Sequence, residues 1–124
     1  MSEKGMTLLE VLVTVIILTM LTSIATLSVG FYLNEGKTRV AEGDLATLKA
    51  AARLYILDTD NPPATLNDLV PDYLPELPDD PFAAAGTSYK RATDATNMYI
   101  YSIGPNGTDN THSGDDIVVT IVLP

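Results

Sequence analysis

The chain contains no cysteine and no tryptophan, and its 7 basic residues are outnumbered by 16 acidic ones. Without cysteine it has neither disulfide bonds nor thiolate metal sites. Its formal net charge of −9 disfavours nucleic acid as a partner, because binding to phosphates requires cationic side chains. The only histidine, His112, has no second histidine nearby and is expected to be a solvated turn residue. Asp79 and Asp80 are adjacent in a proline-rich loop without an expected pocket, so no enzyme is indicated.

A long apolar run begins after Gly5 and continues to about Leu33, interrupted by one acid, Glu10. At about 1.5 Å per residue, a helix of this length crosses a bilayer. A carboxylate in that environment costs ~2.5–3.5 kcal/mol even on the mildest scale, so Glu10 requires a partner. An ordinary anchor needs no such acid, and an ordinary signal peptide has a shorter apolar region with the cleavage site after it.

Residues 1–30, with a basic residue before Gly5 and an acid within the apolar helix, resemble the leader and first helix of type IV pilins and pseudopilins. The resemblance implies that a prepilin peptidase cleaves after Gly5 and that the new N-terminal residue, Met6, is N-methylated. It also implies that Glu10 pairs with the Met6 amine of a neighbouring subunit during filament assembly. The chain departs from the family at Met6, where phenylalanine is usual, and its membrane helix lacks the common proline.

Three segments follow from this reading: a leader (1–5), a membrane and assembly helix (6–33) and a soluble domain (34–124). About 90 residues are enough for one small domain. The resemblance implies a single-pass protein of the inner membrane whose soluble domain lies in the periplasm.

The helical pattern continues beyond the apolar run. Apolar residues recur at spacings of four and three, namely Ala41, Leu45, Leu48, Ala52 and Tyr55. We therefore predict one helix from Thr7 to Leu57, with a possible loosening at Gly36. Pro62 and Pro63 require it to end before them, because proline lacks the amide donor that a helix needs.

The remainder predicts a small sheet packed against the second half of this helix, in an α+β domain. Thr65 and Asp68 resemble a capping box, which predicts a short helix to about Val70. A proline-rich loop follows, and four of its apolar residues are expected to contact the long helix: Tyr73, Leu74, Leu77 and Phe82. The predicted antiparallel strands are Thr87–Arg91, Asn97–Ile103 and Ile117–Leu123, the last of them buried or central because of its β-branched residues.

The segment from Gly104 to Asp116 is rich in oxygen donors, with three carboxylates and two carboxamides. Calcium takes six to eight oxygen ligands in flexible geometry. The spacing is not that of an EF-hand. Because glycine, asparagine and aspartate also form turns without any metal, the alternative is a long polar turn.

Three stretches resemble the major pseudopilin of type II secretion systems: Tyr73–Phe82, Tyr101–Gly107 and Asp115–Ile117. The resemblance implies a calcium-binding loop that stabilises the subunit. The candidate ligands are the carbonyl of Ile103 and the side chains of Asn106, Asp109, Asp115 and Asp116. Asn106 stands where the family has an acid, so weaker binding is expected.

The function implied by the resemblance is that of a structural subunit of a type II secretion pseudopilus, a homo-oligomeric helical filament that assists protein export across the outer membrane. Its partners would be the prepilin peptidase, minor pseudopilins and an inner-membrane assembly platform. One alternative is a type IV pilus subunit serving adhesion, motility or DNA uptake. The other is a membrane-anchored calcium-binding module that does not polymerise and that retains residues 1–5.

Overall fold

The computed structural model describes residue 5 and residues 7–124. The leader residues 1–4 and Met6, the predicted site of N-methylation, lie outside the described residues, whereas Gly5, after which cleavage is predicted, is described. A single long helix, α1 (Leu8–Thr59), confirms the predicted Thr7–Leu57 within two residues at either end and passes unbroken through Gly36. By length and composition alone, it is the one described helix that could cross a membrane.

The chain divides into two compact units, the first ending at Asn34 and the second running from Glu35 to Pro124. In the first unit, the described apolar side chains of α1 are exposed, from 45% for Val11 and Val13 to 87% for Leu8. Such a surface is stable only where lipid or other apolar helices cover it.

The hydrophobic core lies entirely within the second unit. From α1 it takes the predicted stripe, with Ala41, Leu45, Leu48 and Ala52 buried and Tyr55 partly buried against them. The proline-rich loop contributes as expected, since Leu74 is buried and Tyr73, Leu77 and Phe82 pack against the core. This unit therefore contains all the packing that a small domain needs.

The predicted capping box is present at the start of the short 3-10 helix η1 (Leu66–Leu69), where the Thr65 backbone N–H donates to Asp68 Oδ2 at 2.8 Å. Leu66 and Leu69 are buried. The cap fixes the direction in which the chain leaves the end of α1, so that η1 covers one side of the core.

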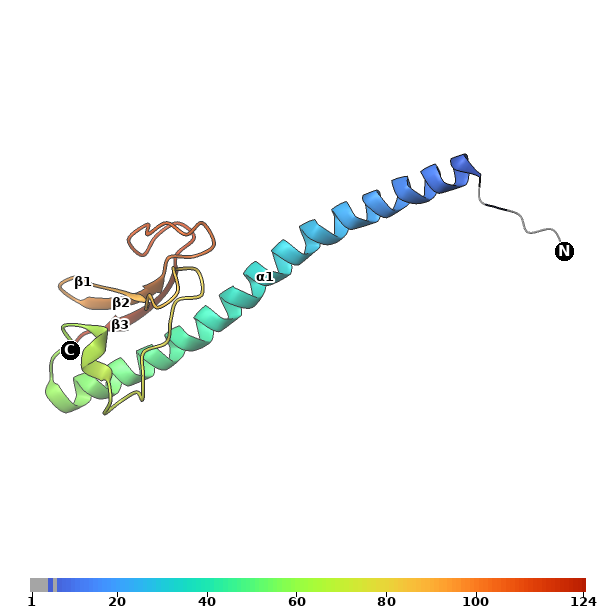
Figure 1. Cartoon of the computed structure of the whole chain (residues 1–124). Helices are drawn as coiled ribbons and strands as arrows, with labels where there is room; N and C mark the ends of the chain where they lie inside the picture. Colours follow the sequence, from blue (N-terminus) through green and yellow to red (C-terminus); the bar gives the residue numbers. More distant parts are fainter. Residues whose placement is uncertain (1–4, 6) are drawn as a thin grey trace. The chain divides into compact units, whose positions relative to one another are not determined.

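Three antiparallel strands form the sheet: β1 (Lys90–Thr93), β2 (Asn97–Ser102) and β3 (Ile117–Val122), in the order β1-β2-β3 (Figure 1). The α+β class is thus confirmed. The central strand is β2, so the prediction of a central position for the β-branched strand was wrong. β3 ends the meander and pairs with β2 alone, and only Ile121 of its residues is buried.

The first strand begins later than the predicted Thr87. The reason is that Thr87 and Ser88 pair with the proline-rich loop: Asp80 N–H donates to the Thr87 carbonyl at 2.9 Å, and Ser88 forms a bridge with Asp79. Pairing with β2 therefore starts only at Lys90.

Candidate functional site

Glu10 lies in the first turn of α1, where Thr7 precedes the helix. The Thr7 backbone N–H donates to Glu10 Oε2, and the Glu10 backbone N–H donates to Thr7 Oγ1, both at 3.2 Å. These reciprocal bonds form a capping box and place a carboxylate at the positive end of the helix dipole. The Glu10 side chain is exposed, and Oε1 accepts no hydrogen bond from any described residue. Among the described residues, one carboxylate oxygen of Glu10 therefore has no partner, which leaves it available to a cationic group of another molecule.

Five serine and threonine side chains within the apolar half of α1 are satisfied by the helix itself. Each donates to a backbone carbonyl three or four residues earlier, at 2.7–3.1 Å; they are Thr14, Thr19, Thr22, Ser23 and Ser28. Because these groups need no water, they do not oppose burial of the helix in lipid.

The loop between β2 and β3 is held by its two closing acids. The Asp115 carboxylate accepts from the Asn106 backbone N–H at 2.9 Å and from Asn110 Nδ2 at 3.0 Å. Asp116 Oδ2 accepts from the Asn110 backbone N–H at 3.1 Å. The acids that the sequence predicted as calcium ligands thus bind the loop's own amides.

Two further candidate ligands also make local bonds. Asn106 Oδ1 accepts from the Thr108 N–H at 2.7 Å, and Asp109 Oδ1 accepts from the Thr111 N–H at 2.9 Å. Burial raises the pKa of Tyr101, and so do the charge and hydrogen bond of Asp109, which places Asp109 beside this tyrosine of β2.

No three described His, Asp or Glu side chains converge closely enough to hold a metal ion, so the three acids among the five predicted ligands do not form a metal-binding cluster here. One observation nevertheless fits a cation, because Asp116 Oδ1 is buried and has no hydrogen-bond partner among the described residues. The available donors are carboxylate, carboxamide and carbonyl oxygens, which suit calcium better than zinc. The chemistry of the donors therefore fits calcium, whereas the three acids do not converge in this loop conformation.

A sequence model of the prokaryotic N-terminal methylation motif matches residues 1–26. Two relatives share the name type II secretion system core protein G. The one from Pectobacterium carotovorum subsp. carotovorum is 28% identical over an alignment that covers 93% of this chain and 83% of the relative. The one from Pseudomonas aeruginosa is 30% identical, and the alignment covers 91% of each chain. No solved structure gives a significant match.

This chain belongs to the family of type II secretion system core protein G. It is a pseudopilin, a pilin-like structural subunit and not an enzyme. The resemblance read from the apolar N-terminus and from the three C-terminal stretches is confirmed.

The pseudopilin contains a buried carboxylate to which sequence reasoning gave no role. Asp80 is 3% exposed and accepts from Ser102 Oγ at 2.7 Å, from the Phe82 N–H at 3.0 Å and from the Ile103 N–H at 3.0 Å. Ser102 Oγ in turn accepts from the Gly104 N–H at 3.2 Å. Asp80 therefore joins the proline-rich loop to the end of β2, where the candidate calcium loop begins. The sequence carries no signal that separates Asp80 from its neighbour, Asp79.

His112 is not the solvated turn residue that was expected. Its ring is stacked on Tyr99 of β2, with centroids 4.4 Å apart and an interplanar angle of 3°, and its side chain is half-buried. His112 adopts a positive φ of 55°, as does Thr111 before it. In the pseudopilin, this stacking holds the middle of the loop against the outer face of the sheet.

Proposed function

We propose that this pseudopilin assembles into the helical filament of a type II secretion system and assists protein export across the outer membrane. It would be inserted once in the inner membrane with residues 34–124 in the periplasm. Prepilin peptidase would process it, and minor pseudopilins and an inner-membrane platform would assist its assembly. The observation that carries this proposal is the α1 surface from Leu8 to Leu33, which is apolar, exposed and marked by a single carboxylate, Glu10.

The exposed surface of α1 supports helix-to-helix packing between subunits. A contact that joins two different surfaces and repeats along one axis gives a filament. Cleavage after Gly5 would create an amine at Met6, and Glu10 would neutralise that amine in a neighbouring subunit. The pairing fixes the register of two helices because an unpaired carboxylate is costly in an apolar environment.

The test compares Glu10→Ala with Glu35→Ala, two exposed glutamates of the same helix. Glu35 lies beyond the apolar run and forms an ion pair with Arg39 at 3.7 Å, and an exposed pair of this kind contributes little to stability. We expect both variants to fold, Glu35→Ala to form filaments and Glu10→Ala to fail. Filaments of normal number and length from Glu10→Ala, seen by electron microscopy, would refute the role of Glu10.

Processing is tested separately by mass spectrometry of the protein purified from membranes. We expect the mature chain to begin at N-methylated Met6. An intact chain that retains residues 1–5 would indicate an anchored module that does not polymerise.

We also propose that calcium binds the loop between β2 and β3, with Asp116, Asp115 and Asp109 as charged ligands and Asn106 and the Ile103 carbonyl as neutral ones. The buried, unpartnered Asp116 Oδ1 supports this proposal. A bound cation would neutralise the adjacent acids and stabilise the start of β3.

Thermal unfolding with calcium and with chelator tests the calcium proposal. A ligand that binds only the folded state adds about 2.7 kcal/mol at a hundredfold excess over its Kd. We expect Asp116→Asn to remove this gain and Asp79→Asn, an exposed acid outside the loop, to retain it. An unchanged midpoint in millimolar calcium would contradict the proposal without affecting filament assembly.

A further inference from the structure

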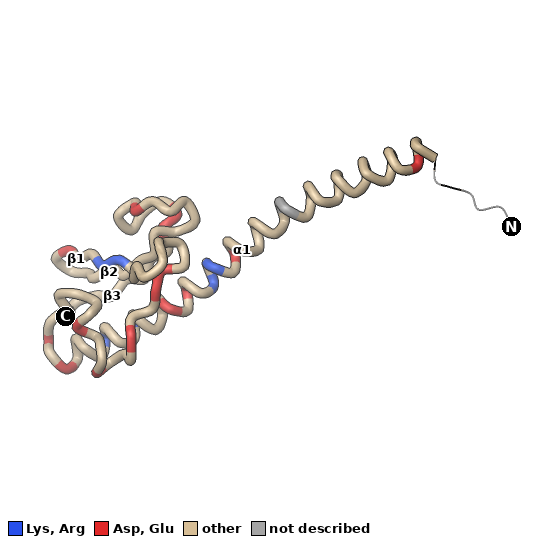
Figure 2. Tube along the Cα trace, viewed as in Figure 1, with Lys and Arg blue, Asp and Glu red and all other residues tan. Residues whose placement is uncertain are grey.

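The second unit is predominantly acidic, and its few cations are unevenly placed. Figure 2 shows acidic residues along α1 and in most loops, and cations both on α1 and on β1, which carries all the cations of the sheet. These are the adjacent residues Lys90 and Arg91, and neither forms an ion pair with any described residue. An unneutralised cationic pair in an acidic domain indicates a partner of opposite charge.

The same strand has a free hydrogen-bonding edge, since β1 pairs with β2 on one side only. The Asp94 N–H donates to the Asn97 carbonyl at 2.9 Å, so residue 94 faces β2. Along an antiparallel strand, the backbone N–H and C=O groups of successive residues point alternately toward and away from the neighbouring strand. The backbone groups of Arg91 and Thr93 therefore point away from β2. No described residue bonds to the outward N–H of Arg91 or Thr93.

A cleft of about 320 Å³ lies between this strand and η1. It is lined by residues before and within η1, by Leu77 and by the β1 segment: Ala64, Thr65, Leu66, Asn67, Ser88, Tyr89, Lys90 and Arg91. Arg91 Nε is buried without a hydrogen-bond partner among the described residues. A buried N–H of a charged group is costly to leave unpaired, which again favours an external acceptor.

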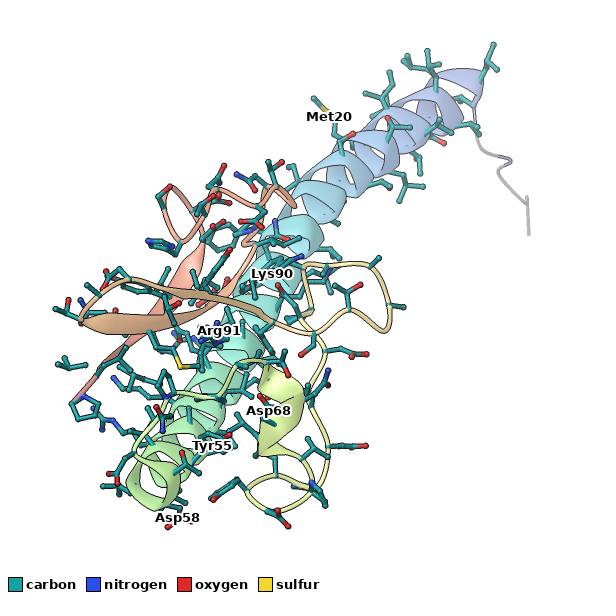
Figure 3. The ribbon with its side chains drawn as sticks, turned by 90° about the vertical axis from the view of Figure 1, so that its left-hand side faces the viewer. Met20, Tyr55, Asp58, Asp68, Lys90 and Arg91 are labelled. Atoms are coloured by element: carbon teal, nitrogen blue, oxygen red, sulfur yellow. The ribbon has the colours of Figure 1, made fainter. Side chains whose placement is uncertain are left out.

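Lys90 and Arg91 present their side chains on opposite faces of β1, as consecutive strand residues do. Arg91 pairs with Ile100 and shares its face, whereas Lys90 pairs with Tyr101, and both of these β2 residues are buried. Figure 3 labels the two cationic residues, Lys90 and Arg91. An added strand with two consecutive acids would therefore place one carboxylate on each face. The other edge strand, β3, has no charged residue and offers no such discrimination.

We propose that the β1 edge, with the cleft beside it, binds an extended acidic segment of another protein chain by strand addition. Backbone hydrogen bonds to Arg91 and Thr93 hold the segment, and its carboxylates meet the Arg91 guanidinium and the Lys90 ammonium. Affinity comes from the backbone bonds and selectivity from the charges.

The test uses the full-length protein in detergent micelles and two labelled peptides, acetyl-Thr-Val-Glu-Glu-Val-Thr-amide and the same peptide with two lysines. Fluorescence anisotropy measures binding. We expect the acidic peptide to bind and the basic one to fail. Arg91→Gln should weaken binding by about tenfold or more, since it removes charge-assisted hydrogen bonds. Thr93→Pro should abolish it, because proline removes an outward edge donor.

Lys49→Gln, on α1 and outside the cleft, is the matched control and should bind like the original chain. Lys90→Gln, at an exposed position, keeps the proposal testable if Arg91→Gln does not fold. Equal binding of the two peptides, no binding at millimolar concentration, or an unaffected Thr93→Pro would overturn the proposal. If free citrate binds as tightly as the acidic peptide, the site recognises a small anion and not an extended segment, which would also overturn the proposal.

Discussion

Replacing Asp80 by alanine removes the acceptor that joins the proline-rich loop to the end of β2. Three donors lose their partner at once: Ser102 Oγ, the Phe82 N–H and the Ile103 N–H, at 2.7, 3.0 and 3.0 Å. Because Ser102 is fully buried and Asp80 is 3% exposed, water reaches these groups poorly. The variant therefore leaves polar groups unsatisfied inside the domain, beyond losing the bonds themselves.

The magnitude follows from the number and type of bonds. Hydrogen bonds to a charged group contribute about 1.5–3 kcal/mol each, so three give about 4.5–9 kcal/mol before relaxation. Allowing for local rearrangement and water entry, we expect Asp80→Ala to lower the unfolding free energy by at least about 3 kcal/mol. For a domain of this size, 1 kcal/mol corresponds to about 4–8 °C, so the midpoint should fall by about 12 °C or more.

The assay is urea and thermal unfolding of a fragment from Glu35 to Pro124, which contains the whole hydrophobic core. Asp79→Ala is the matched control, because the adjacent carboxylate is exposed and accepts one bond, from the Gly86 N–H at 3.2 Å. It should cost less than about 1 kcal/mol. Equal losses for the two variants, or a loss below 1 kcal/mol for Asp80→Ala, would refute the reasoning.

Three other variants test the same domain. Burial and the bond to Asp44 raise the pKa of Tyr89, so its stabilising effect is complete below pH ~10 and is lost as pH rises further; Tyr89→Phe should flatten the alkaline part of the stability curve measured by urea unfolding. Backbone hydrogen bonds lower the pKa of Asp94, so its contribution is present above pH ~3.9 and is lost as pH falls; Asp94→Asn should reduce acid sensitivity in the same assay. Gly104→Ala should lower the thermal midpoint more than Gly107→Ala, because both positions have positive φ but only an added Cβ at Gly104 meets other backbone.

The long helix was predictable because its two signals are local. The apolar stretch of residues 6–33 predicts a membrane helix, and the stripe from Ala41 to Ala52 predicts a packed amphipathic one. The capping pair Thr65 and Asp68 is local as well. Each of these depends on residues within a few turns of one another, so tertiary structure did not alter them.

Strand positions were harder to predict because pairing is not local. The β-branched run of β3 has the composition of a central strand, yet its place in the meander leaves it at an edge. Thr87 likewise has strand propensity, but its carbonyl binds the Asp80 N–H instead of β2. The composition of a segment indicates whether it can form a strand. Which strand it pairs with depends on the order in which the chain adds strands to the sheet.

The candidate calcium loop shows the same limit at the level of single side chains. The oxygen donors of the loop were visible in the sequence. The residue that holds the start of the loop, Asp80, was not, because Asp79 and Asp80 are identical residues in the same proline-rich loop. Asp80 matters for the loop because it accepts a hydrogen bond from the Ile103 N–H and, through Ser102, holds the Gly104 N–H. These bonds orient the strand end that precedes every side-chain ligand proposed. If calcium binds this loop, Asp80→Ala should therefore weaken the binding although Asp80 is not a ligand, and Asp79→Ala should not. Calcium titration of the two variants, under conditions where both are folded, separates an oriented site from a loop that binds through composition alone.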